Sequence, residues 1–217
     1  KNIREIKKSP CKTLGSVVRF KYKIGRMNFD LTIVENNSNE IKYPKRRKVM
    51  GRFDVLIIGG GVVGSAIARE LTRYQLRIGV LEKNLDVCYE TSGRNSGVVH
   101  GGFAYDVGTL KAKLCVEGNQ GMDELSRELG FVFKRCGKVL VGKTPEDLET
   151  LKRTIAQGEK NGATKLRLLN KEELHELVPT AVGEFAMFSE NSGIVDPFNY
   201  TIALAENAAQ NGAEYFF

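Results

Sequence analysis

The sequence is poor in the residues that build metal centres and disulfide frameworks. It holds four cysteines and two histidines in 217 residues. The cysteines are widely spaced, and they form no CxxC motif and no Cys/His ligand group, which argues against a zinc or iron–sulfur site. Few, scattered cysteines are also typical of a reducing compartment. We therefore expect no bound metal and a cytoplasmic location.

Long apolar runs are missing as well. No run reaches the roughly 18 residues that a membrane-spanning helix needs. The first thirty residues contain no continuous apolar core like that of a secretory signal. With 41% hydrophobic residues, the composition is that of a folded globular protein. These observations predict a soluble protein, and they leave peripheral contact with a membrane open.

The positive charge is concentrated at one end of the chain. Of the 33 Lys/Arg and 26 Asp/Glu, residues 1–49 hold 14 basic and 4 acidic ones, so the remainder is mildly acidic. A protein that binds a phosphate backbone is expected to carry positive charge on its folded surface. We therefore predict no nucleic-acid binding. The run KRRK at residues 45–48 is either a localisation or docking signal or, as we favour, a solvated basic linker.

From residue 53 onward the pattern predicts a β–α–β unit. FDVLIIGG is an apolar run ended by glycines and predicts a strand that is buried on both faces. GVVGSAIARELTRY follows with helical spacing, and RIGVLE returns to a short apolar strand. A unit of this length implies two parallel strands joined by a right-handed crossover. The helix carries its apolar residues at Val63, Ile67, Leu71 and Tyr74.

The rest of the chain alternates between helical and strand patterns. Residues 109–130 predict one long helix, and residues 131–143 predict two strands that turn near Cys136 and Gly137. Capping-box patterns begin at Thr144 and Asn170. A final helix has Asp196 as its N-cap and Pro197 at its first position, and AEYFF after it begins another strand.

The turn of the β–α–β unit matches GxGxxG, with Gly59, Gly61 and Gly64 as its glycines. Gly59 permits a tight turn, Gly61 lets the backbone approach a pyrophosphate, and Gly64 lets the helix pack closely on the strand. Glu82 ends the second strand 18 residues after Gly64, where a carboxylate accepts hydrogen bonds from ribose hydroxyls and repels a 2′-phosphate. The unit predicts a dinucleotide site for either NAD or FAD. The alternative is a glycine-rich turn that binds no nucleotide.

The segment TSGRNSGVVHGG, residues 91–102, favours FAD over NAD. It contains four glycines, three hydroxyl side chains and one amide. A cofactor with a flat ring system along the protein needs a second stretch of close backbone approach. Hydroxyls at Thr91, Ser92 and Ser96 would serve its pyrophosphate or ribityl chain. The alternative is a mobile surface loop.

Together these motifs resemble the FAD-dependent oxidoreductases of the D-amino-acid-oxidase superfamily. The resemblance rests on GGGVVG with Glu82, on TSGRNSGVVHGG and on GTLKAKLCVEGN, and it covers residues 53–217. Within the superfamily the chain is most similar to FAD-dependent glycerol-3-phosphate dehydrogenases, and next to L-2-hydroxyglutarate dehydrogenases/oxidases. Such proteins are about twice this length, so the chain looks truncated.

The resemblance implies an α/β fold with a Rossmann-like FAD-binding domain (parallel sheet, βαβ) and part of a mixed α+β substrate domain. Residues 1–49 are a basic N-terminal extension with no assigned fold. Residues 50–130 would form the first part of the FAD-binding domain, and residues 131–195 a portion of the substrate or cap domain. Residues 196–217 would return to the FAD-binding domain.

The resemblance also assigns FAD contacts residue by residue. The glycine-rich turn would meet the pyrophosphate and Glu82 the adenosine ribose. Thr91 and Ser92 would contact phosphate, and the residues from Asn95 to Val98 would line the ribityl chain and the isoalloxazine. The expected cofactor contacts are Gly59, Gly61, Val62, Val63, Gly64, Glu82, Lys83, Thr91, Ser92, Asn95, Ser96, Gly97 and Val98.

The implied reaction is oxidation of a small anionic secondary alcohol, with hydride transfer to flavin N5. Glycerol 3-phosphate is the expected substrate and L-2-hydroxyglutarate the alternative; the electron acceptor is left open between a quinone and an electron carrier. His100 is the candidate base, and its alternative role is a structural histidine bonded to a backbone carbonyl. Arg94 either pairs with an anion or faces solvent. A function of another class is a dinucleotide-binding fragment without catalysis.

Overall fold

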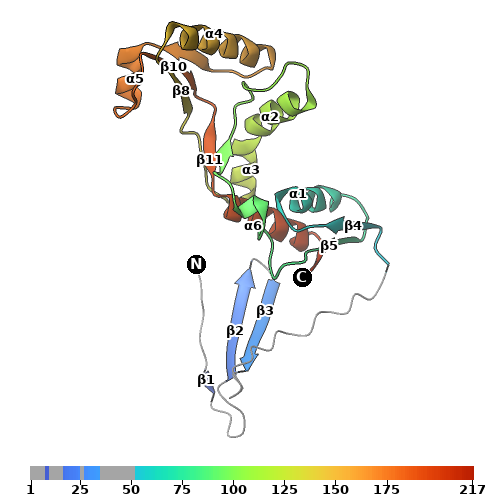
Figure 1. Ribbon diagram of the computed structural model, residues 1–217. Coiled ribbons are helices and arrows are strands. Elements are labelled where there is room, and N and C mark those ends of the chain that lie inside the picture. The colour runs from blue at the N-terminus through green and yellow to red at the C-terminus, as the bar shows by residue number, and fades with distance from the viewer. Residues whose placement is uncertain (1–7, 10–16, 25–26, 35–51) are drawn as a thin grey trace. The chain divides into compact units, whose positions relative to one another are not determined.

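The computed structural model describes residues 8–9, 17–24, 27–34 and 52–217 of the chain (Figure 1). The chain forms two compact units, one of Lys1–Glu90 with Thr201–Phe217 and the other of Thr91–Tyr200. The basic run at residues 45–48 lies outside the described residues. The functional domain boundaries expected from the sequence at residues 130 and 195 stay predictions.

The described part of the first 49 residues is a small antiparallel sheet. It consists of β1 (Lys8–Ser9), β2 (Val17–Ile24) and β3 (Met27–Val34), in the order β1-β2-β3. The register of β2 and β3 sets apolar residues opposite one another, for example Phe20 opposite Leu31. From Val18 to Ile24, apolar and polar residues alternate in the sequence, which is typical of such a strand. No fold is expected for this region from the resemblance, which begins further on.

The predicted β–α–β unit is confirmed. Strand β4 (Val55–Ile58) leads to helix α1 (Val62–Leu71) and then to β5 (Ile78–Leu81), which pairs in parallel with β4. Strand β12 (Glu214–Phe216) adds a third parallel strand on the other edge of β5, so the sheet order is β12-β5-β4. The chain therefore has the parallel α/β architecture that the sequence predicts.

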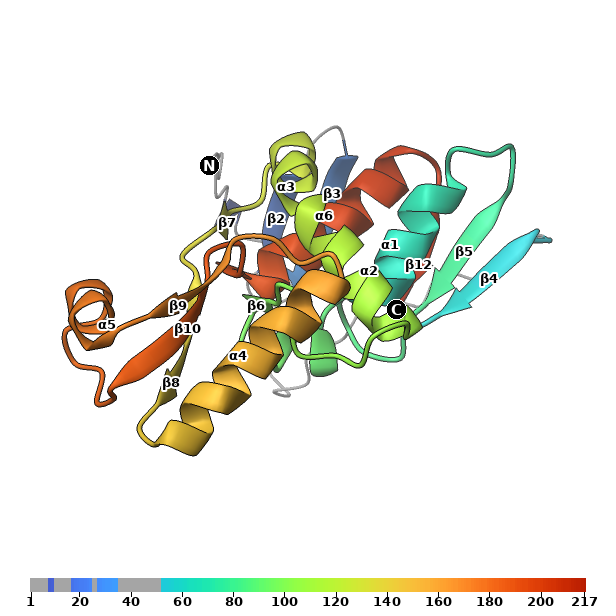
Figure 2. The same cartoon turned by 90° about the horizontal axis from the view of Figure 1, so that it is seen from above.

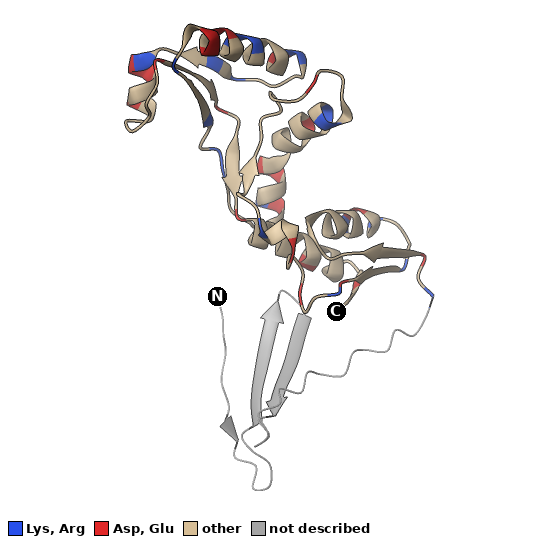
Figure 3. Cartoon of the chain, in the orientation of Figure 1, with Lys and Arg blue, Asp and Glu red and all other residues tan. Residues whose placement is uncertain are grey.

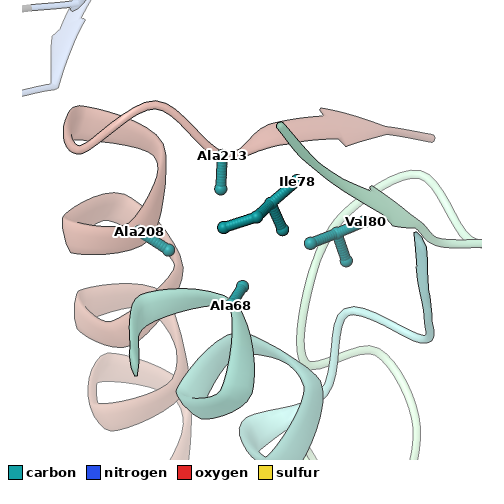
Figure 4. Close-up of a cluster of buried hydrophobic side chains, with 5 residues drawn as sticks. All are labelled: Ala68, Ile78, Val80, Ala208 and Ala213. Atoms are coloured by element: carbon teal, nitrogen blue, oxygen red, sulfur yellow. The ribbon is translucent and has the colours of Figure 1, made fainter. Parts of the chain in front are cut away.

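The core of this unit lies between the sheet and two helices. Side chains from α1, from β5 and from the C-terminal part of α6 (Pro197–Gln210) point toward one another (Figure 4). Both helices pack on the same face of β5, because Ile78 and Val80 are two positions apart and belong to the same cluster. The cluster consists of Ala68, Ile78, Val80, Ala208 and Ala213.

Two expectations about burial in this unit are wrong. Strand β4 is not buried on both faces, since Leu56 is 52% and Ile58 80% exposed on the face away from the helices. On α1, Val63 and Ile67 are exposed, whereas Ser65 and Ala68 face the sheet. In the middle of the helix small side chains thus meet the sheet, and of the larger apolar side chains Leu71, in its last turn, packs against the core.

The second unit is built on two small antiparallel sheets. In one, β10 (Phe185–Ser189) lies between β8 (Lys138–Gly142) and β9 (Leu166–Leu169). In the other, β11 (Gly193–Val195) lies between β6 (Val98–Val99) and β7 (Phe133–Lys134). The two strands expected over residues 131–143 therefore exist as β7 and β8, but each pairs with a different partner. Residues 185–195 likewise form two strands, one in each sheet.

Helix α4 (Pro145–Lys160) runs along the β8-β10-β9 sheet (Figure 2). Leu151 of α4, Met187 of β10 and Phe103 form the buried cluster between them. The short helix α5 (Lys171–Leu177) packs by way of Leu174 against Leu169 and Ala186. Lys, Arg, Asp and Glu are interspersed over the helices of this unit (Figure 3).

The capping predictions are confirmed, and one helix prediction is wrong. Thr144 and Asp147 exchange side chain–backbone hydrogen bonds of 3.2 and 3.0 Å at the start of α4, and the same box occurs at Asn170. The single helix expected over residues 109–130 is two helices, α2 (Leu110–Gln120) and α3 (Met122–Leu129), which meet at Gly121. Glycine has a low helix propensity, which favours a break at Gly121, although Gly118 lies within α2.

Candidate functional site

The glycine-rich turn between β4 and α1 leaves space beside its backbone. Gly59 has a φ of 106°, and a Cβ built on it would meet no atom within 4 Å. The N-cap of helix α1 is Gly61, so no side chain caps the helix, and its first turn contains no acidic residue. A helix N-terminus with these properties attracts an anion through its N–H groups and its dipole. The turn therefore fits the pyrophosphate of a dinucleotide.

In the same turn, glycine is required at position 64 for a different reason. A Cβ at this position would overlap the carbonyl oxygen of Gly59. The first turn of α1 thus lies directly on the loop, as the motif predicts for its third glycine. Any larger residue at position 64 would push the helix away from the sheet.

The carboxylate of Glu82 is fixed beside this turn. Its Oε2 accepts a hydrogen bond of 2.8 Å from the Gly60 N–H, and its Oε1 accepts bonds of 2.8 and 3.0 Å from the backbone and side chain of Asn84. Partial burial raises the pKa of Glu82, but the bonds from the Asn84 and Gly60 N–H groups outweigh it and lower the pKa. The carboxylate is therefore ionised and oriented, as an acceptor for ribose hydroxyls must be.

Lys83 lies next to Glu82 but pairs with another group. Its Nζ forms an ion pair of 2.9 Å with Glu90, and its side chain is 76% exposed. The Glu90 hydrogen bond raises the pKa of Lys83. The first unit thus brings together the predicted glycines and Glu82, with Lys83 at the rim of the group. Its role as a cofactor contact stays a prediction.

The second predicted segment, residues 91–102, is a well-defined loop. It begins with a 3₁₀ turn over Thr91–Gly93 and ends in β6. Asn95 organises the turn: its Nδ2 donates to the carbonyl oxygens of Thr91 and Ser92, at 3.1 and 2.8 Å, and its Oδ1 accepts from the Gly97 N–H at 2.9 Å. The Asn95 side chain therefore serves the loop itself, while the side chains of Thr91 and Ser96 are exposed.

Three glycines of this loop are required by the packing of the chain on itself. A Cβ at Gly97 would overlap the carbonyl oxygen of Val195, and one at Gly102 would overlap the side chain of Val116. A Cβ at Gly101 would lie 2.8 Å from the Ser189 Oγ. The abundance of glycine in this segment thus has a structural cause within the second unit. The interpretation that these glycines mainly admit a ring system is incomplete.

Side-chain amides hold the backbone that follows His100. The His100 carbonyl accepts from Asn119 Nδ2 at 3.0 Å, and the Phe103 carbonyl from Gln157 Nε2 at 3.3 Å. Asn161 Nδ2 donates to the carbonyls of Gly102 and Tyr105, at 3.2 and 2.7 Å. Sequence reasoning missed these amides, because their partners lie 19 to 59 residues away and no local pattern marks them.

His100 itself has an unpaired imidazole in a positively charged setting. The ring makes no hydrogen bond to any residue in the described part of the chain, so the alternative of a ring held by a backbone carbonyl is not observed. Burial lowers the pKa of His100, and the charges of Lys138 and Lys111 lower it further. At neutral pH the imidazole is therefore neutral and able to accept a proton. Arg94, on the same loop, is exposed.

The two lysines near His100 lie over aromatic rings of the segment that follows it. Lys111 Nζ is 4.5 Å from the centroid of the Tyr105 ring, and Lys138 Nζ is 5.8 Å from that of Phe103. Neither lysine forms an ion pair with an acidic residue among those described. Two cations without acidic partners make this part of the second unit attractive to an anion.

Three further observations concern only the residues that the structure describes. Among them, no group of three or more His, Cys, Asp or Glu side chains is placed to hold a metal ion, and no helix is long and apolar enough to cross a membrane. A cavity of about 500 Å³ at the start of α2 contains none of the predicted site residues. It is lined by Gly108, Thr109, Leu110, Ala112, Lys113, Val116, Glu117, Lys160 and Asn161.

A parallel β–α–β unit with an uncapped glycine turn and an ionised glutamate at the end of β5 defines a dinucleotide-binding α/β protein. Comparison with known proteins identifies the family. Residues 54–217 match the family described as FAD dependent oxidoreductase, DAO. Because the match covers most of the chain, the chain belongs to this family of FAD-dependent oxidoreductases, as the sequence motifs predicted.

Individual relatives agree with this assignment. The chain is 42% identical over 166 residues to a glycerol 3-phosphate dehydrogenase of Caloramator mitchellensis, covering 76% of this chain and 35% of that protein. It is 38% identical to the human mitochondrial L-2-hydroxyglutarate dehydrogenase, covering 74% and 35%. The structure of L-alpha-glycerophosphate oxidase from Mycoplasma pneumoniae, with FAD bound, matches with a TM-score of 0.73 and 32% identity over 76% of this chain and 44% of that one. The chain thus spans about a third of the length of these curated relatives.

Proposed function

We propose that the protein of which this chain is part oxidises a small anionic secondary alcohol, glycerol 3-phosphate first, as an FAD-dependent dehydrogenase. The observation that carries the proposal is the state of His100: its imidazole has no hydrogen bond to a described residue, and burial together with the charges of Lys138 and Lys111 lowers its pKa. Such a group accepts the hydroxyl proton of an alcohol, while the lysines attract the anionic part of the same molecule. FAD, when bound, supplies the acceptor for the hydride.

The residues of the first unit support the binding of FAD. Gly59 and the N-terminus of α1 would hold the pyrophosphate, because a Cβ at Gly59 would point into open space and no side chain caps the helix. Glu82 would hold the adenosine ribose with a carboxylate that Gly60 and Asn84 keep ionised. The same carboxylate disfavours a phosphate on the ribose.

The choice of substrate follows the relatives. The chain is 42% identical to a protein named glycerol 3-phosphate dehydrogenase and 38% identical to one named L-2-hydroxyglutarate dehydrogenase. Glycerol 3-phosphate and L-2-hydroxyglutarate, the molecules in these two names, are secondary alcohols that carry an anionic group. Either molecule suits a site in which a base lies near cations. The difference in identity favours glycerol 3-phosphate.

The full-length protein tests the proposal. It is assayed with glycerol 3-phosphate and with L-2-hydroxyglutarate, each with a dye as electron acceptor. We expect a higher kcat/KM for glycerol 3-phosphate, and a preference for L-2-hydroxyglutarate would overturn the choice of substrate. The variant His100→Gln should lower kcat by about 100-fold or more, the usual range for a general base, with FAD content unchanged.

The binding of FAD is tested separately. Glu82→Arg, which places a cation where the ribose hydroxyls need an acceptor, should cripple FAD binding, while Glu90→Arg at the neighbouring rim is the matched control. Equal FAD affinity of the two variants would refute the role of Glu82. If the 217-residue chain binds FAD but shows no turnover, and the full-length protein is also inactive on both alcohols, the alternative of a dinucleotide-binding protein without catalysis replaces the proposal.

A further inference from the structure

The amide of Asn119 joins His100 to the turn between β10 and β11. Asn119 lies near the end of α2 and is only 4% exposed. Its Nδ2 donates to the carbonyl oxygens of His100 and of Asn191, each at 3.0 Å. Its Oδ1 accepts a hydrogen bond of 3.0 Å from Arg135 Nη1. Both N–H groups and the oxygen of this buried amide are therefore hydrogen-bonded, and each bond leads to a different segment.

Arg135 holds that amide in place with its whole guanidinium. Nε donates to Asp123 Oδ2 at 2.7 Å, Nη2 donates to the Asn119 carbonyl at 2.8 Å, and Nη1 donates to Asn119 Oδ1 and to the Asn191 carbonyl. The guanidinium also lies 5.0 Å from the centroid of the Phe133 ring. Only the planar fork of arginine can serve these acceptors at once; lysine has the same charge but a single nitrogen.

The position of His100 depends on this pair of side chains. His100 is the first residue after β6, where the ladder to β11 ends with Val99 opposite Gly193. Beyond that point, the carbonyl of His100 is held by Asn119 and, more weakly, by Cys115 Sγ at 3.5 Å. The charged groups that act on the ring are Lys111 from α2 and Lys138 from β8, and no acidic residue is among them.

We propose that Arg135 and Asn119 are positioning residues that fix the backbone at His100, and with it the imidazole. The inference rests on the proposed function for the reaction that His100 serves, whereas the placement of the ring is a property of the chain itself. Loss of either side chain would free the backbone at residue 100. The imidazole, which is already solvent-exposed, would then lose its fixed position relative to the charges of Lys111 and Lys138.

The titration of His100 in the 217-residue protein tests this directly. The chain has two histidines, so His175 on α5, whose Nδ1 lies 2.9 Å from the Lys171 carbonyl oxygen, is an internal reference in the NMR spectrum. In Arg135→Lys and in Asn119→Leu, the pKa of His100 should rise toward the ordinary value for histidine. Arg127→Lys is the matched control, because Arg127 also contacts Asp123 but neither Asn119 nor Asn191.

The alternative is a purely structural role for the two side chains. In that case the variants would have a lower unfolding temperature and an unchanged pKa of His100, which would overturn the proposal. If Arg135→Lys and Asn119→Leu fail to fold, Asp123→Asn provides a milder change, since the Asp123 side chain is 52% exposed and removing its charge only loosens the fork. An unchanged His100 titration in this folded variant would also count against the proposal.

Activity of the full-length protein separates this inference from the proposed function. With both correct, Arg135→Lys lowers kcat roughly 10- to 100-fold, as expected for a misplaced reacting group, and shifts the acidic limb of the pH–rate profile upward. A shifted His100 titration in a full-length protein that oxidises neither alcohol would refute the function and keep the positioning role. A normal rate and pH profile in Arg135→Lys would refute the positioning role and keep the function.

Discussion

Gly59 and Gly102 belong to the two glycine-rich segments of the chain, and both have a left-handed backbone, with φ of 106° and 84°. Their surroundings differ. A Cβ at Gly59 would enter open space, whereas one at Gly102 would overlap the side chain of Val116. Similar sequence in the two segments thus has two physical causes. The first segment leaves room beside its backbone for another molecule, and the second fills that room with its own chain.

The comparison shows why glycine content is an ambiguous guide to a ligand. The GxGxxG motif of the first segment contains a glycine beside open space and a glycine required by packing. Gly59 borders open space, whereas Gly64 packs on the carbonyl of Gly59. In the second, Gly97 and Gly101 are packed like Gly102. The FAD assignment therefore depends on the glycine turn, on Glu82 and on the family match, and less on the number of glycines in residues 91–102.

The largest effect is expected for Gly102→Ala. The left-handed backbone costs about 1–2 kcal/mol for alanine, and overpacking against Val116 adds about 1–3 kcal/mol. Urea unfolding should show the free energy of unfolding lowered by the sum of the two. Adding Val116→Ala should recover part of the loss, beyond what the separate effects predict. A Gly102→Ala protein as stable as the wild type would contradict the packed character of the second segment.

Gly59→Ala should destabilise the protein less but impair FAD more. Only the backbone term applies, about 1–2 kcal/mol, because the new methyl group meets no atom of the chain. The methyl group would instead occupy the space beside the turn, so the Kd for FAD in the full-length protein should rise about tenfold or more, equivalent to about 1.4 kcal/mol. Flavin fluorescence titration measures it. An unchanged Kd would contradict the conclusion that the first segment, unlike the second, leaves room beside its backbone for another molecule.

Glu82→Gln tests the electrostatics of the first segment. The pKa of Glu82 is lowered in the folded chain, so its charge contributes stability above the ordinary glutamate pKa and loses that contribution as pH falls through the folded value. At pH 7 the variant should be about 1 kcal/mol less stable, a modest value because the group is partly solvated. The difference should vanish in acid. Urea unfolding at pH 7 and at pH 3 checks this, and a difference that persists at pH 3 would contradict the assignment.

The smallest change in stability is expected for Lys138→Met, within about 0.5 kcal/mol. Its effect falls on His100, whose pKa should rise because Lys138 contributes more to its lowering than Lys111 does. Lys111→Met should raise the pKa less. NMR titration with His175 as reference measures the change in the pKa of His100 in both variants. Lys113→Met is the control, because Lys113 lies on α2, as Lys111 does. A larger rise for Lys111→Met would reverse the order.

Much of the fold could be predicted from local sequence. The turn at Gly59, the parallel pairing of β4 with β5 and the capping box at Thr144 all depend on residues close together in the chain, and all are confirmed. Partner strands were not predicted in the same way. Strands β7 and β8 are adjacent in sequence, yet they pair with β11 and β10, because the register depends on packing between distant segments.

The candidate site likewise has a part that local sequence predicts and a part that depends on distant segments. The position of Glu82 beside the glycine turn follows from the length of one β–α–β unit, and its bond to the Gly60 N–H bears that out. The bonds of Asn119 to the carbonyl oxygens of His100 and Asn191 span 19 and 72 residues. No periodicity or motif in one sequence marks such a pair, so the structure was needed to find it.

The three described cysteines lie at three depths: Cys88 is buried, Cys115 is intermediate and Cys136 is exposed. Their rates of reaction with a thiol reagent should therefore differ. In a Cys11→Ser background, a thiol-alkylating reagent would modify Cys136 at once, Cys115 when the second unit opens and Cys88 when the first unit opens. The rates at Cys88 and Cys115, with that at Cys136 as the reference, would therefore report the local opening of each unit without an introduced cysteine.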